Sequence, residues 1–318
     1  MNKFIKTTMC IAALFSSISF ACTTVGWLSD YGMIISRTQD WSENSFPTLT
    51  RIEAGTVRNL HGTPTGDTYK TKYTIAGILA YSGLIHDAVN EKGLQMNGLY
   101  YKPMTLPKAE KDSVSQLELG GYILAMYSSV EEAVTHLKTL KVGSVSMPGA
   151  PAPILLHWAI TDKTGDRAVI EYDADGLKIY RGEDAMVMTN QPSQQIHLDN
   201  VKTIKKFGPG IDFGSKGNTN PEDRFKEATY FRSQLKDATS SRNAMLKVFS
   251  VAPIIPQDAA NILNGKESTY ATEWQMTTNL TTGETIFSYH FNDTWNNLEW
   301  NYKSIIENTD FKPLPLYK

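Results

Sequence analysis

The sequence predicts an α+β protein built on antiparallel strands, and three observations support this class. Strand-like segments occur in pairs joined by short turns rich in Gly, Asp and Asn, as expected of hairpins. Helical segments are grouped between sets of strands instead of alternating with single strands, which argues against a regular parallel sheet. Residues 22–318 contain no internal repeat, low-complexity stretch or linker, so we expect a single domain.

The first 21 residues have the layout of a secretory signal peptide. Lys3 and Lys6 form a basic start, residues 9–15 are apolar, and residues 19–21 end the segment with a small-x-small pattern. The apolar run is too short to span a bilayer, and no later stretch approaches the roughly 20 apolar residues that a spanning helix needs. We therefore expect a periplasmic or secreted mature protein that begins at Cys22 and has no membrane anchor.

The elements that follow are read in order from turn residues and hydrophobic period. A hairpin of residues 23–28 and 33–38 turns at 29–32 and returns residues 37–40 to the side of Cys22. Further strands are expected at 73–80, 83–89, 94–101, 154–161, 167–172, 177–180, 185–189, 269–278 and 285–291. Helices are expected at 114–127, 130–140, 222–235, 241–251 and 257–263, and a long loop at 208–220.

Charge and histidine spacing exclude two classes of function. The chain has 31 Lys and Arg against 33 Asp and Glu, a net charge of −2, and no basic stripe with interleaved aromatic residues. A nucleic-acid partner is therefore not expected. The six histidines lack the His-x-x-His and His-Glu-x-x-His spacings of metal sites, so no metal is expected. His86 and His157 lie in apolar, strand-like runs, where a structural role is expected.

Cys22 is the one cysteine left when residues 1–21 are removed, and an unpaired thiol in an exported protein is open to oxidation. Two roles place a cysteine at this position. The first is lipid attachment, which would make the chain a lipid-anchored, non-catalytic binding protein. The second is catalysis by a newly exposed N-terminal residue. Phe20 stands where lipoprotein signals have a small residue, and a strand follows Cys22 directly; both features favour catalysis.

An N-terminal cysteine carries its own base. The ordinary pKa of an α-amino group is about 7.7–8.0 and that of a thiol is about 8.5, so the amine can take the thiol proton. Arg37 beside the thiol would favour the thiolate, and Asp40 could hold the ammonium group. The alternative for Arg37 and Asp40 is a surface ion pair at the end of a strand.

Six short stretches then carry a resemblance to a known family. Singly they are weak, but their order and spacing are specific; they are residues 22–23, 37–41, 90–94, 156–171, 189–192 and 221–225. Over nearly the whole of residues 22–318 the sequence resembles the choloylglycine hydrolase family. These linear-amide hydrolases include penicillin V acylases and bile salt hydrolases.

The resemblance implies a four-layer αββα sandwich of two antiparallel sheets between helical layers, of the N-terminal-nucleophile hydrolase type. It implies that Cys22 is nucleophile and base, with Arg37 beside the thiol and Asp40 beside the amine. The oxyanion would be held by the side-chain amide of Asn190 and the backbone N–H of Tyr100. Arg224 would complete the polar site, and Trp41 would line the acyl pocket or belong to the core.

The resemblance also bears on substrate and assembly. The residue at position 100 tends to be Tyr in penicillin V acylases and Asn in bile salt hydrolases, so Tyr100 favours a penicillin V acylase-like amide hydrolase. Bile salt hydrolase and N-acyl homoserine lactone acylase activity are the alternatives. The resemblance implies a small-molecule amide substrate and no cofactor. The stretch between Asn190 and Arg224 is shorter than in Gram-positive members, where it helps build a tetramer, so a homo-oligomer, dimer or tetramer, stays open.

Overall fold

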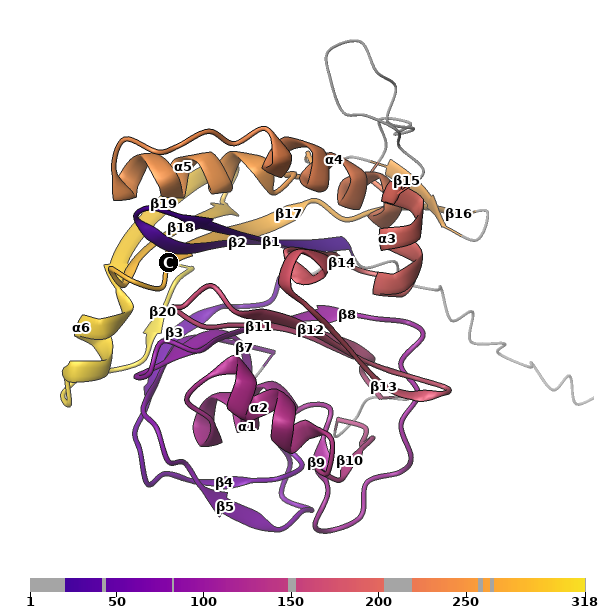
Figure 1. Ribbon diagram of the computed structural model, residues 1–318. Helices are drawn as coiled ribbons and strands as arrows, with labels where there is room; N and C mark the ends of the chain where they lie inside the picture. Colours follow the sequence, from indigo (N-terminus) through magenta and orange to yellow (C-terminus); the bar gives the residue numbers. More distant parts are fainter. Residues whose placement is uncertain are drawn as a thin grey trace, which may run out of the picture.

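Two antiparallel sheets lie face to face between two layers of helices in the computed structural model (Figure 1). This arrangement confirms the predicted α+β class and the αββα sandwich. The structure describes residues 21–41, 44–81, 83–147, 153–202, 219–256, 260–263 and 266–317. Residues 1–20 of the expected signal peptide and most of the expected loop at 208–220 lie outside this set. Within it, no helix is long and apolar enough to span a membrane.

The first sheet has the strand order β14-β1-β2-β17-β18-β19. These strands are β1 (Ala21–Ser29), β2 (Gly32–Asp40), β14 (Val187–Thr189), β17 (Thr272–Asn279), β18 (Glu284–Phe291) and β19 (Thr294–Asn301). Helices α4 (Pro221–Ser233) and α5 (Ser241–Val251) pack on its outer face, and α3 (Gln194–Lys202) packs against α4. β1 is therefore an interior strand with a partner on each side.

The second sheet has the order β13-β12-β11-β8-β7-β6-β3-β20. Its strands are β3 (Thr48–Ile52), β6 (Ile75–Ala80), β7 (Leu84–Asn90), β8 (Gln95–Tyr100), β11 (Leu156–Thr161), β12 (Arg167–Asp173), β13 (Gly176–Arg181) and β20 (Leu314–Pro315). Helices α1 (Leu119–Met126) and α2 (Val130–Leu137) cover its outer face (Figure 1). The remaining elements are β4 (Val57–Asn59), β5 (Thr68–Lys70), β9 (Val114–Ser115), β10 (Val142–Gly143), η1 (Gly182–Ala185), β15 (Ala260–Leu263), β16 (Lys266–Thr269) and α6 (Tyr302–Glu307).

Two predicted helices need correction. The segment 257–263 is not helical where it is described, because Ala260–Leu263 forms strand β15, paired with β16. A short segment of this kind carries too few periods to separate helix from strand. The segment 114–127 begins as strand β9, and its helix α1 starts only at Leu119. Strand β19 was not predicted, because this partly exposed edge strand is mostly polar.

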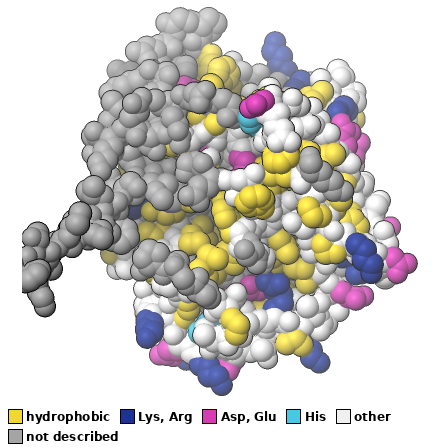
Figure 2. Space-filling view, turned by 180° about the vertical axis from the view of Figure 1, so that it is seen from behind, with side chains coloured by type: hydrophobic (Ala, Val, Ile, Leu, Met, Phe, Trp, Pro, Cys, Tyr) yellow, Lys and Arg dark blue, Asp and Glu magenta, His cyan; other side chains and the backbone are white. Residues whose placement is uncertain are grey.

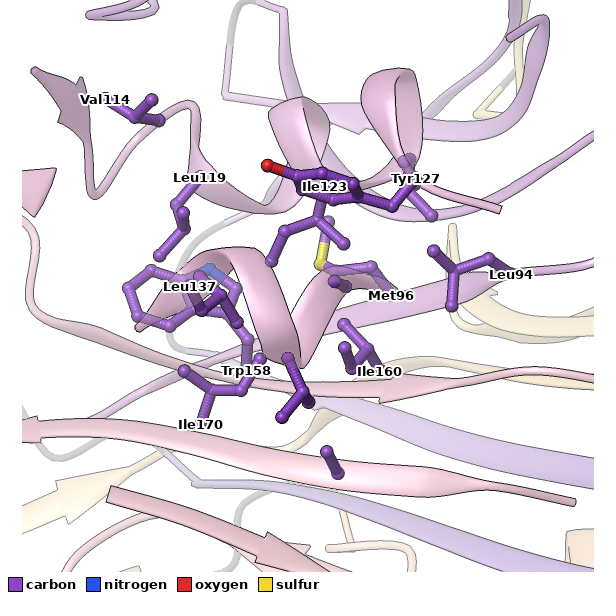
Figure 3. Close-up of a cluster of buried hydrophobic side chains, with 14 of the residues drawn as sticks. Leu94, Met96, Val114, Leu119, Ile123, Tyr127, Leu137, Trp158, Ile160 and Ile170 are labelled. Carbon is purple, nitrogen blue, oxygen red and sulfur yellow. The ribbon is translucent and has the colours of Figure 1, made fainter. Parts of the chain in front are cut away.

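The largest hydrophobic core lies between the second sheet and the α1–α2 pair. Leu119 and Ile123 from α1 and Leu137 from α2 meet Trp158 and Ile170 from the sheet (Figure 3). Separate clusters fill the space between the two sheets and the space under α4 and α5. On the side turned away in Figure 1, hydrophobic side chains also gather at the surface across the middle of the molecule (Figure 2).

Ile123 tests the contribution of the α1 layer. Its side chain is 0% exposed, so Ile123→Ala removes buried methyl groups and leaves a cavity. We expect the free energy of unfolding to fall by about 2–5 kcal/mol, measured by urea denaturation. Ile196→Ala in α3 is the matched control, because this side chain is 47% exposed and its loss should change stability by less than about 0.5 kcal/mol. Equal losses for both variants would contradict the assignment of the core.

Candidate active site

The β1–β2 hairpin sorts the site residues onto two faces of the first sheet. Cys22 pairs with Gln39 in the register of the two strands, so both side chains point to the same face. Arg37 lies two residues before Gln39 and shares this face, which looks toward the second sheet. Thr38 and Asp40 point the other way, toward the helices, because successive side chains of a strand alternate.

Cys22 lies almost fully buried, with 3% of its surface exposed. Its thiol donates to Gln39 Oε1 over 3.7 Å, and Arg37 Nη2 donates to Sγ over 3.7 Å. Its backbone N–H donates to Asn190 Oδ1 over 2.5 Å, and its carbonyl accepts from Arg224 Nη1 at 2.7 Å. In the full chain this nitrogen is the amide of the peptide bond to Ala21.

Asn190 follows β14, which pairs with β1 through Thr23 and Thr189. The Asn190 amide is held at both ends: Oδ1 also accepts from Arg224 Nη2 at 3.0 Å, and Nδ2 donates to the Tyr100 carbonyl over 2.8 Å. Asn190 Nδ2 carries two N–H groups, so a second donor is present on the same atom. The amide thereby joins the end of β8 in the second sheet to the end of β14 in the first.

Arg224 and Asp40 occupy the helix side of Cys22. Arg224 lies in the first turn of α4, which begins with the Asn220 cap and Pro221. Its Nη1 donates to Thr23 Oγ1 over 2.6 Å and lies 3.9 Å from Asp40 Oδ2. The Asp40 carboxylate also accepts from the hydroxyls of Thr272 (2.6 Å) and Thr38 (3.1 Å).

Arg37 extends from the first sheet into the second. Its Nη2 donates to the Gly98 carbonyl over 3.2 Å, and its Nη1 lies 3.5 Å from Asp87 Oδ2. The guanidinium stacks 4.6 Å above the ring of Trp274. Asp87 is in turn hydrogen-bonded by the Asn97 amide at 2.6 Å and by His86 Nδ1 at 2.8 Å.

A cavity of about 1350 Å³ opens beside the Cys22 sulfur. Its wall is mostly apolar and includes Trp41, Leu84, Ile85, Met96, Ile154 and Trp158. Tyr100 and Gln191 border it near Asn190, while Gln39, Tyr81 and His86 line it near the sulfur. The cavity has the composition of a site for an apolar acyl group, with polar groups gathered at one end.

Burial controls the protonation of both titrating groups beside Cys22. It raises the pKa of the Cys22 thiol to about 11, although the Arg37 charge acts in the opposite direction. It also raises the pKa of the Asp40 carboxyl to about 6, against the opposing effect of Arg224. The thiol of the uncleaved chain is therefore neutral at pH 7. Its polar side-chain contacts, an amide and a guanidinium, cannot take its proton.

Residues 22–309 match the family described as linear amide C–N hydrolases, choloylglycine hydrolase family. The chain belongs to the choloylglycine hydrolase family. It is 28% identical to the penicillin V acylase of Pectobacterium atrosepticum over 251 residues, 72% of this chain and 66% of that protein. It is 32% identical to a bile salt hydrolase/transferase of Lactiplantibacillus plantarum over 153 residues, 45% of this chain and 47% of that one. These matches span less than two thirds of either relative.

Solved structures share the fold over almost the whole chain. The penicillin V acylase from Agrobacterium tumefaciens superposes with a TM-score of 0.79 at 22% identity, covering 93% of this chain and 92% of that one. A variant of the conjugated bile acid hydrolase from Clostridium perfringens gives 0.77 at 20% identity, with 93% and 96% covered. At these identities the likeness establishes the fold and not the substrate.

The structure brings together the residues that the family resemblance singled out. Cys22, Arg37, Asp40, Asn190 and Arg224 form one connected group, and Tyr100 and Trp41 border the adjoining cavity. Their catalytic roles stay predictions. Within the described ranges, no group of three or more His, Cys, Asp or Glu side chains could hold a metal ion.

Four further residues at the site received no functional role from the sequence: Gln39, Tyr81, His86 and Asp87. The hairpin register contained a signal for Gln39, because it places this residue opposite Cys22 and two residues after Arg37. The other three arrive from β7 and the turn before it. Nothing local in the sequence relates that segment to Cys22.

Asp40 makes stability depend on pH in the uncleaved chain. Its pKa in the folded protein is about 6 against 3.8 ordinarily, so between these values the folded state binds a proton that the unfolded chain has lost. The free energy of unfolding should therefore fall as the pH rises from about 4 to about 6. We expect Asp40→Asn to flatten this decline, as measured by urea denaturation across that range.

Asp175→Asn is the control for this experiment. Asp175 is exposed, and its hydrogen bond with Lys178 lowers the pKa of the carboxyl, so it titrates below the tested range. The decline should persist in this variant. An unchanged decline in Asp40→Asn would contradict the assignment to Asp40.

Proposed function

We propose that this chain hydrolyses a linear amide through an acyl-enzyme formed on Cys22. The observation that carries the proposal is the position of the Cys22 sulfur, beside a mostly apolar cavity and among Arg37, Asn190 and Arg224. Membership of a family of linear amide C–N hydrolases supports the same activity. The match to that family starts at Cys22, the residue that the cleavage would expose.

The proposed reaction begins when the free α-amine of Cys22 takes the thiol proton. The sulfur then attacks the amide carbonyl carbon, and the oxygen of the tetrahedral intermediate accepts hydrogen bonds from Asn190 Nδ2 and the Tyr100 backbone N–H. When the C–N bond breaks, the α-ammonium gives its proton to the leaving amine. The α-amine of Cys22 then deprotonates a water molecule, which attacks the thioester and releases the carboxylic acid.

The charged residues have separate tasks in this proposal. Arg37 stabilises the thiolate electrostatically, while Asp40, which lies beside Arg224 on the helix side of Cys22, holds the α-ammonium once the amine is free. Arg224 keeps two groups in place, since it donates both to the Cys22 carbonyl and to the Asn190 side chain. A positive charge next to Asn190 also favours the developing oxyanion.

For the substrate we propose a penicillin V acylase-like amide with an apolar acyl group. The aromatic and aliphatic wall of the cavity, with Trp41 and Trp158, suits an aryl or fatty acyl chain. The relatives named above are a penicillin V acylase and a bile salt hydrolase/transferase. Turnover of penicillin V, a long-chain acyl homoserine lactone and glycocholate, measured side by side, tests this ranking. Preference for glycocholate would overturn it.

We further propose that residues 1–21 are removed during export to the periplasm or beyond, which creates the catalytic amine. The rival is a lipid-anchored binding protein with diacylglycerol on Cys22. The buried sulfur, contacted by Gln39 and Arg37, argues against that modification, because the lipid would have to enter the sheet sandwich. The intact mass of the mature protein distinguishes the two: a free N-terminal Cys22 supports the enzyme and a lipid adduct excludes it.

Two variants test the mechanism. Cys22→Ala should abolish turnover and the acyl adduct, because the thioester cannot form. Asn190→Ala should lower kcat by about 10²–10³ while the adduct still forms slowly, because one oxyanion donor is lost. Burst kinetics and mass spectrometry of the trapped adduct provide the measurements. Thr282→Ala, on the distant β17–β18 turn, is the control and should turn over normally. Turnover by Cys22→Ala would refute the proposed nucleophile.

A further inference from the structure

Gln39 contacts the Cys22 sulfur directly but has no role in the mechanism above. It is 2% exposed and lines the cavity, and its Oε1 accepts the Cys22 thiol hydrogen bond at 3.7 Å. Its Nε2 donates to the Tyr81 hydroxyl over 2.8 Å. One side of the amide therefore faces the reacting sulfur, and the other faces a hydroxyl.

Tyr81 is held in place by its own contacts. Its backbone lies in the left-handed region with φ of 48°, which is uncommon for an aromatic residue. Its N–H donates to the Ser45 carbonyl over 3.2 Å, and its ring packs edge-on against Trp41 at 5.9 Å. Because strain of this kind persists only where the surroundings impose it, the hydroxyl is presented to Gln39 at a fixed position.

The Asp40 backbone N–H also donates to the Cys22 sulfur. Even with that hydrogen bond, Arg37 leaves the thiolate incompletely stabilised. Its Nη2 is shared between the sulfur and the Gly98 carbonyl, and its charge is offset by Asp87 at 3.5 Å. A buried sulfur anion needs hydrogen-bond donors, because burial disfavours the charged form. In the resting orientation Gln39 presents an oxygen to the sulfur, which suits a thiol and would repel a thiolate.

We propose that Gln39 is a further catalytic residue whose side-chain amide inverts as Cys22 loses its proton. In the resting enzyme Oε1 accepts from the thiol and Nε2 donates to Tyr81. When the S–H bond breaks and the proton passes to the α-amine of Cys22, the electron pair stays on the sulfur. The amide then turns by half a rotation, Nε2 donates to the sulfur, and Oε1 accepts from the Tyr81 hydroxyl.

In both orientations Gln39 keeps one hydrogen bond to the Cys22 sulfur and one to the Tyr81 hydroxyl. The two ends of a primary amide have nearly the same size, so the rotation needs no extra space. A phenol hydroxyl can accept or donate a hydrogen bond, which lets Tyr81 serve either orientation. Burial raises the pKa of Tyr81 well above its usual range, so the hydroxyl keeps the proton that it must donate.

The inference rests on Cys22 as nucleophile, but its test reads the thiol directly and needs no turnover. The measurement is the pH dependence of Cys22 alkylation by iodoacetamide in the processed protein. Besides the α-amine, the titratable or charged groups around the thiol and its Gln39–Tyr81 contacts are Arg37, Asp40, Tyr81, His86, Asp87, Arg224 and Glu273. All of them are retained in the Gln39 variants.

The sign of the effect decides between an inverting and a fixed amide. If the amide inverts, Gln39→Leu removes a donor to the thiolate and the pKa of the thiol should rise by about one unit. If the amide stays as an acceptor, the same variant removes a partner of the neutral thiol and the pKa should fall. A fall or no change overturns the proposal. Gln39→Met repeats the test should Gln39→Leu fold poorly, as judged by circular dichroism.

Two tyrosine variants distinguish a hydrogen bond from Gln39 to the sulfur from a general disturbance of the site. Tyr81→Phe removes one hydrogen bond from each orientation, so the pKa of the thiol should move by less than half of the Gln39→Leu shift. A rise as large as that of Gln39→Leu would overturn direct donation. Tyr172→Phe is the matched control, because this buried hydroxyl lacks a hydrogen-bond partner among the described residues, and no change is expected. If the unaltered protein showed no amide turnover, the proposed function would be refuted, but the pKa measurements on the thiol would still test the role of Gln39.

Discussion

The hydrogen bond from the Cys22 nitrogen to Asn190 Oδ1 depends on where β1 lies in its sheet. β14 pairs with one edge of β1 and delivers Asn190, while β2 pairs with the other edge and delivers Arg37, Gln39 and Asp40. β1 can pair with both β14 and β2 only because it is an interior strand of the sheet. A register slip of one residue would turn Cys22 from the cavity face to the helix face, because side chains alternate along a strand.

The proposed chemistry uses the thiol and the backbone nitrogen of Cys22, and the two faces of β2 present different residues to these two groups. Arg37 and Gln39 meet the sulfur on the side of the second sheet, whereas Asp40 and Arg224 lie on the side of the helices. The thiol and the backbone nitrogen of Cys22 thus meet different electrostatic surroundings only a few bonds apart. Strand alternation achieves this with consecutive residues and needs no loop.

Burial keeps the Cys22 thiol protonated in the uncleaved chain. The pKa of this thiol is raised to about 11, and its side-chain contacts are an amide that accepts its hydrogen bond and a guanidinium. Neither contact is a base that could remove the proton while the Cys22 nitrogen belongs to a peptide bond. A free α-amine, with an ordinary pKa of about 7.7–8.0, would supply the missing base. Under the proposed function, the removal of residues 1–21 and the activation of the thiol are one event.

Local patterns predicted much of the fold because its hairpins are local. The β1–β2, β12–β13 and β17–β18 hairpins follow from turn residues between strand-like segments, and α5 begins and ends where predicted. The predictions failed where a short segment had an ambiguous period, as in β15, or where an edge strand was polar, as in β19. In both, the pairing partner and not the segment's own residues decides the conformation.

The sequence by itself determined which residues come together at the start of the first sheet: a cysteine directly after a segment with the layout of a signal peptide, and a hairpin that returns Arg37 and Asp40 to it. Resemblance added Asn190 and Arg224, since their distance along the chain hides their contact with Cys22. The hairpin register also contained a signal for Gln39, which it places opposite Cys22. Only the tertiary structure decided that Tyr81, His86 and Asp87 complete the surroundings of the sulfur, and that a cavity opens there. The physical reason is that the packing of one sheet on the other creates these contacts, and side chains from separate sheets carry no shared signal in sequence.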